Sequence, residues 1–71
     1  MCLQEYKIYL IDGHVIKAAE EVAIPAEQRL HNRFKKAKFE DVLTVGSEET
    51  SRAFIPVRNI LYISTGEMIR W

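Results

Sequence analysis

The pair Asp12-Gly13 stands between two runs of residues that favour β-strands, and it limits the possible folds more than any other feature. Residues 6–11 are rich in β-branched and aromatic side chains, which fall alternately on the two faces of a strand. An Asp-Gly pair directly after such a run favours a tight turn into an antiparallel strand. The sequence therefore predicts an opening hairpin whose second strand covers residues 14–19.

One helix is expected after this hairpin. Residues 18–23 contain good helix formers, so a continued strand and a helical turn both remain open there. Pro25 suits the first position of a helix, and residues 26–37 contain no Gly, Pro or β-branched residue. A single apolar stripe runs along this segment, formed by Ala26, Leu30, Phe34 and Ala37. We predict a helix over residues 26–37, with its basic residues towards the C-terminal end.

The second half of the chain has the pattern of short strands. Strands are predicted over residues 39–45, 52–55, 60–64 and 68–71, with a polar loop at 46–51 and turns at 57–59 and 65–67. We expect five aromatic side chains in the core, namely Tyr6, Phe34, Phe39, Phe54 and Tyr62. The predicted fold is mainly β with one helix, a single small domain over residues 1–71. It is a small, strongly bent antiparallel sheet or barrel, or alternatively an α+β two-layer domain with the helix across the sheet.

Two segments resemble Sm-like small β-barrels. Residues 10–18, Leu-Ile-Asp-Gly-His-Val-Ile-Lys-Ala, resemble the opening hairpin of that family, and residues 54–63 resemble its closing pair of strands. The resemblance covers roughly the first quarter and the last third of the chain, and it implies an Sm-like barrel that binds RNA. The chain departs from the family in placing its helix after the second strand. Only Arg58 and Asn59 correspond in position to the second signature of the family.

The charges are balanced in number but not in position. Ten Lys and Arg residues oppose ten Asp and Glu residues, which excludes a generally basic nucleic-acid coat protein. Residues 26–38 nevertheless hold five positive charges against Glu27 alone. We therefore name six candidates for contact with RNA or another anionic partner, namely Arg29, Arg33, Lys35, Lys36, Lys38 and Arg58. The alternative is a solvated helix face.

The apolar content is high for a chain of this length. Hydrophobic residues make up 48% of the 71 residues, and the isoleucines cannot all fit one face of a small sheet. Either a barrel closes over them or an edge strand pairs with a second copy, and self-association is the favoured reading. The candidate interface residues are Tyr9, Ile11, Ile69 and Trp71.

The sequence lacks the residue patterns that metal binding and nucleophilic catalysis need. Cys2 is the one cysteine, neither histidine has a second metal ligand at helical spacing, and no Gly-x-Ser-x-Gly elbow is present. We therefore expect no metal, no cofactor and no enzymatic activity. The N-terminus lacks the pattern of a signal peptide and no apolar run could cross a membrane, so a cytoplasmic protein without a membrane partner is expected.

The sequence does not identify a function. The favoured reading is a non-enzymatic binding or assembly module that acts through an oligomeric or protein–protein interface. Self-association comes first among the expected partners, followed by another protein. The alternative is an Sm-like RNA-binding protein that uses the basic helix over residues 26–37.

Overall fold

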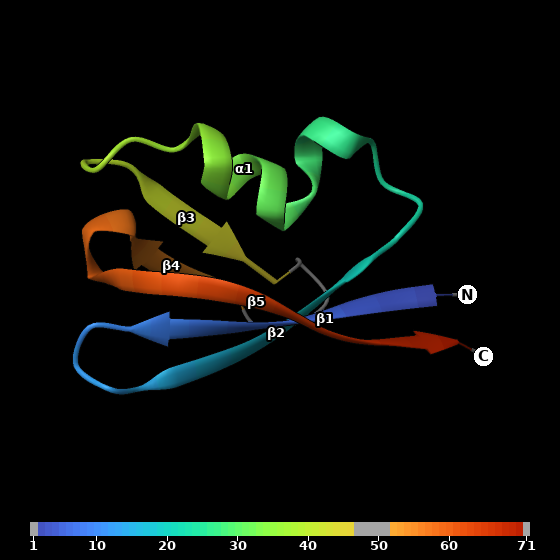
Figure 1. Ribbon diagram of the computed structural model, residues 1–71. Helices are drawn as coiled ribbons and strands as arrows, with labels where there is room; N and C mark the ends of the chain where they lie inside the picture. Colours follow the sequence, from blue (N-terminus) through green and yellow to red (C-terminus); the bar gives the residue numbers. More distant parts are fainter. Residues whose placement is uncertain (1, 47–51, 71) are drawn as a thin grey trace.

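The computed structural model describes residues 2–46 and 52–70 (Figure 1). The elements in chain order are β1 (Cys2–Leu10), β2 (Val15–Glu21), a 3₁₀ turn (Ala26–Gln28), α1 (Leu30–Lys36), β3 (Val42–Val45), β4 (Ala53–Pro56), a second 3₁₀ turn (Val57–Asn59) and β5 (Ile60–Arg70). The chain is mainly β with one α-helix inserted after the first hairpin, which confirms the predicted fold class.

The opening hairpin forms as predicted. The turn is closed by bonds from the amide of Leu10 to the carbonyl of His14 (2.9 Å) and from the amide of Gly13 to the carbonyl of Leu10 (3.1 Å). Gly13 has φ of +94°, a conformation that side chains with a Cβ rarely adopt. The Asp12 carboxylate accepts a bond from the amide of His14 at 3.0 Å. Strand β2 continues to Glu21, so most of the ambiguous segment 18–23 is strand.

The strands form two antiparallel sheets within the described residues, with no closed barrel. The larger sheet has the order β2-β1-β5, so β1 is its central strand, while β3 and β4 form a separate pair. The helix lies on the same side of the larger sheet as β3 (Figure 1). Its Leu30 packs into the core with Tyr6 and Ile8 of β1, as expected for a helix laid across a sheet.

The predicted turn at residues 65–67 is wrong, because β5 runs without interruption from Ile60 to Arg70. Strand β1 pairs with β5 on both sides of Gly66, at Thr65 and at Met68, and this pairing outweighs the local turn preference of Gly66. The register of β1 against β5 shifts between Gln4 and Tyr6, which lets β5 continue past Gly66. Gly66 fits there because an added Cβ would lie only 3.3 Å from the Cβ of Glu5.

The helix is shorter than predicted. Arg29 has an extended backbone (φ −66°, ψ 143°), so it separates the 3₁₀ turn of Ala26–Gln28 from α1. From the predicted stripe, Leu30 is buried, Phe34 and Ala37 are half-buried, and Ala26 is exposed.

The core is mainly aliphatic; of the five aromatic residues predicted in it, Tyr6 is buried and Phe34 packs against it. Its buried members are Tyr6, Ile8, Leu30, Leu43, Val45, Ile55 and Ile60. Phe39 and Phe54, in contrast, are 71% and 67% exposed, and Tyr62 is also exposed. Phe54 is displaced because its neighbour Ile55 pairs with Leu43 on the core side, and successive side chains of a strand face opposite ways.

Candidate functional site

A row of apolar side chains crosses the outer face of the larger sheet. Tyr9 pairs with Val15 of β2 on one side and with Tyr62 of β5 on the other. The rings of Tyr9 and Tyr62 are stacked, with centroids 4.3 Å apart and planes inclined by 17°. Ile8, which precedes Tyr9, is fully buried, so strand alternation places this row on the face opposite the core.

Two further exposed apolar residues lie at the same end of the sheet. Ile11 follows β1 and donates its amide to the carbonyl of Asn59, which brings it beside the start of β5. Leu61 precedes Tyr62, next to the register shift opposite Tyr9 and Leu10. Their exposed fractions are 63% and 64%. We call the set Tyr9, Ile11, Val15, Leu61 and Tyr62 the apolar platform.

The platform can bury surface, and its only polar side-chain groups are the hydroxyls of Tyr9 and Tyr62. Stacked tyrosines present a large, rigid apolar area with hydroxyl groups at the rim, a composition that favours contact with another macromolecule. Isolated exposed apolar residues are ordinary on protein surfaces, whereas several gathered at one place mark an interaction site. The platform is therefore the best candidate site in the described structure.

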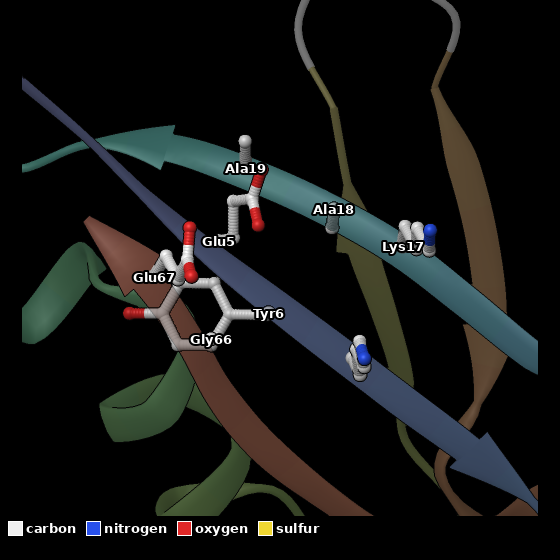
Figure 2. A pocket seen from close by; sticks show the side chains of 8 residues that line it. Glu5, Tyr6, Lys17, Ala18, Ala19, Gly66 and Glu67 are labelled. Atoms are coloured by element: carbon white, nitrogen blue, oxygen red, sulfur yellow. The ribbon is translucent and has the colours of Figure 1, made fainter. Parts of the chain in front are cut away.

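A polar hollow of about 470 Å³ lies farther along the larger sheet (Figure 2). Its rim carries two lysines, Lys7 and Lys17, and two carboxylates, Glu5 and Glu67. Lys7 stands directly opposite Lys17 in the pairing of β1 with β2. Charges of both signs are mixed around this hollow, so it selects neither an anion nor a cation.

Arg29, a predicted RNA contact, is engaged inside the chain. Its Nε donates to the Glu20 carboxylate at 3.1 Å, and its two terminal nitrogens donate at 3.4 Å to the Val22 carbonyl and to the Tyr6 hydroxyl. The hydrogen bond to Tyr6 and the bond to Glu20 raise the pKa of Arg29. The side chains of Arg29 and Glu20 are only 16% and 15% exposed, so this guanidinium is a structural group.

Arg33 is also tied to the fold. Its Nε donates to the carbonyl of Gln28 at 3.0 Å, and a terminal nitrogen donates to the carbonyl of Thr44 at 2.8 Å. The second bond links α1 to the backbone of β3.

The other predicted basic residues remain exposed. Lys35, Lys36 and Lys38 lie at and just after the C-terminal end of α1, and Arg58 lies in the 3₁₀ turn before β5. Their side chains have no hydrogen-bond or ion-pair partner within the described part of the chain. The structure thus divides the six candidates into two embedded arginines and four exposed cations.

Glu20 and the Tyr6 hydroxyl form a network that the sequence did not predict. The Glu20 carboxylate accepts bonds from the Leu30 amide at 2.8 and 3.1 Å, and so caps a helix whose own N-cap residue supplies no side-chain bond. The Tyr6 hydroxyl lies 3.1 Å from Nδ1 of His31. Burial, partly offset by the bond from Arg29, raises the pKa of Tyr6.

The predicted interface residues do not form one surface. Tyr9 and Ile11 belong to the platform, while Ile69 pairs with Leu3 at the opposite end of the sheet. Trp71 lies outside the described residues. Val15 and Leu61 were not predicted as interface residues, and Tyr62 was predicted in the core. The available signal was strand alternation, because Val15 and Tyr62 share the face of Tyr9 once the register is known.

Other kinds of site find little support in residues 2–46 and 52–70. No three side chains among His, Cys, Asp and Glu come together there as a metal site would require. In the same part of the chain, no helix has the length and apolar character needed to span a membrane. No model of a known protein family, no curated protein and no solved structure matches the chain.

Proposed function

We propose that the protein is a non-enzymatic binding and assembly module, and that copies of it associate through the apolar platform. The observation that carries this proposal is the gathering of four exposed apolar side chains around the half-buried Tyr9 at one end of the larger sheet. A core of seven buried residues leaves this surface uncovered. Association removes it from water, and burial of apolar area is the main driving force of most protein contacts.

The platform suits contact with an identical surface. In a twofold dimer the same patch meets itself, so a charged patch would repel its copy and an apolar patch would not. The platform contains only apolar and tyrosine side chains, and the nearest lysine pair, Lys7 and Lys17, lies two residues farther along the strands. Its centre therefore resembles the core of a protein interface, where charged residues are depleted.

Sedimentation equilibrium over a range of concentrations tests the proposal. We expect the average mass of the wild type to rise with concentration, and Leu61→Asp or Tyr62→Asp to lower that mass. Phe39→Asp is the matched control, because Phe39 is more exposed than either residue but lies outside the platform. A wild type that stays monomeric, or platform variants that associate as strongly as the wild type, would contradict the proposal.

RNA binding is the second candidate function. It is favoured by the exposed side chains of Lys35, Lys36 and Lys38, which have no acidic partner within the described residues. We expect that replacing all three by Glu would abolish binding of a labelled single-stranded RNA at low salt, whereas Lys7→Glu would not. Phosphate contacts weaken as salt is raised, so binding indifferent to salt would rule this function out.

A further inference from the structure

Strand β2 is an edge strand of the larger sheet. The bonds from the Leu10 amide to His14 and from the Val22 amide to Cys2 show that the even-numbered residues of this hairpin pair with β1. In an antiparallel ladder the residues between them direct their backbone groups the other way. The outward-directed residues of β2 are Val15, Lys17, Ala19 and Glu21, and all four are exposed. Figure 1 shows no other labelled strand beyond this side of β2.

Strand β3, unlike β2, has a backbone carbonyl that is already bonded by a side chain. There the carbonyl of Thr44 is occupied by the side chain of Arg33 at 2.8 Å. A covered edge cannot accept another strand, whereas an uncovered one is a template for pairing. Among the described residues, no backbone bond outside the pairing with β1 involves Val15, Lys17, Ala19 or Glu21.

The sequence of this edge is complementary to itself. When two copies of β2 run antiparallel with Ala19 opposite Ala19, each Lys17 faces a Glu21 of the other copy. Opposite charges at directly paired positions attract, and the small Ala19 side chains leave the centre open. The neighbouring symmetric registers, centred on residue 18 or 20, place Ala19 opposite Lys17 or Glu21 and so form no ion pair. Registers centred on residue 17 or 21 place like charges opposite each other. Opposite charges therefore favour the register centred on Ala19.

We propose that β2 pairs antiparallel with β2 of a second copy in this register, with two Lys17–Glu21 ion pairs across the contact. The three-stranded sheets then join into one continuous antiparallel sheet. A twofold axis perpendicular to the sheet leaves both apolar platforms on the same face. The inference rests on the proposed assembly function, for which it supplies a second contact distinct from the platform. With both contacts, assembly proceeds beyond the dimer.

The test is a charge exchange in the Leu61→Asp background, where the platform contact is removed. Lys17→Glu and Glu21→Lys each turn two attractive pairs into repulsive ones, so we expect each to raise the dissociation constant by about tenfold or more. An equimolar mixture of the two variants restores opposite charges at every pair and re-forms a dimer. Lys36→Glu is the control, since it makes the same charge change on α1, away from β2.

A second variant tests the backbone contact. Ala19→Pro removes an amide that points away from β1, so it leaves the hairpin paired but blocks a partner strand. We expect a folded monomer in the Leu61→Asp background, with the circular dichroism of the parent.

Each outcome decides between the two contacts. If Leu61→Asp alone is monomeric while the wild type associates, edge pairing is wrong and the proposed function stands. If Leu61→Asp still associates but neither charge variant nor Ala19→Pro weakens it, edge pairing is again wrong. If the wild type is monomeric at every concentration, both proposals are wrong. Should Lys17 instead guard the edge, Lys17→Ala would strengthen association, which would also overturn the pairing.

Discussion

Tyr6 connects the first strand to the helical segment through its hydroxyl group. The ring is 1% exposed, and the hydroxyl lies 3.1 Å from Nδ1 of His31 and 3.4 Å from Arg29. We predict that Tyr6→Phe lowers the free energy of unfolding by about 1 kcal/mol at neutral pH, because the hydroxyl bonds are lost while the ring still packs. Urea denaturation measures the difference.

The same residue gives the fold a sensitivity to alkaline pH. Burial raises the pKa of Tyr6 above its usual value of 10.0. A raised pKa means that the folded chain holds this proton more tightly than the unfolded chain does. Its contribution is therefore complete below pH 10 and is lost as the pH rises through the folded-state pKa. We expect the wild type to lose more stability than Tyr6→Phe above pH 10, whereas parallel curves would contradict this assignment.

Gly13 is required by its backbone conformation rather than by space. Its φ is +94°, and a Cβ added there would meet no atom within 4 Å. Gly13→Ala should therefore lower the free energy of unfolding by about 1 kcal/mol through conformational strain alone. Gly13→Asn should recover part of this loss, because Asn tolerates the left-handed region. Thermal denaturation of the three proteins checks the order, and equal stability of the Ala variant and the wild type would refute it.

The conformation and exposure of single residues could be predicted where they depend on neighbours in the sequence. The turn at Gly13 could be predicted, because an Asp-Gly pair and its flanking strands are adjacent in sequence. The exposure of Phe54 and Tyr62 could not, because it depends on register. Ile55 faces the core through its pairing with Leu43, and Tyr62 faces outward through its pairing with Tyr9. Composition alone assigned these aromatic residues to the core.

At the level of elements, α1 depends on a cap supplied by β2. Glu20 accepts two bonds from the Leu30 amide and one from Arg29. We predict that Glu20→Ala costs about 2 kcal/mol in the free energy of unfolding, since charged hydrogen bonds are lost and Arg29 loses its partner. Glu20→Gln should cost less, because one amide oxygen can still accept from Leu30. Urea denaturation tests this order, and a loss below about 0.5 kcal/mol for Glu20→Ala would contradict the capping role.

The elements were predicted best where the pattern is short-range. The order of strands and the position of the helix after the first hairpin are confirmed. The helix start was misplaced, because its cap comes from Glu20, ten residues before Leu30. The break predicted within β5 was wrong, because pairing with β1 outweighed the turn preference around Gly66. In both cases a partner distant in sequence decided the local structure.

The whole molecule has a formal net charge of zero, but its surfaces differ in character. The larger sheet carries the apolar platform at one end, and its edge strand β2 carries the exposed Lys17 and Glu21. Lys35, Lys36 and Lys38 lie apart from it, around the end of α1. Tyr9 and Ile11 could be predicted from the sequence but the complete platform could not, because the alignment of three strands brings its members together.

The most direct test of the assembly function is the mass of the wild-type protein in solution as its concentration changes. Sedimentation equilibrium should show an average mass that rises steadily from that of one 8.3 kDa chain towards that of a dimer and larger species. The same series with Leu61→Asp and Lys17→Glu combined should stay at the monomer mass. A wild-type mass that remains at one chain throughout the concentration range would contradict the proposed function.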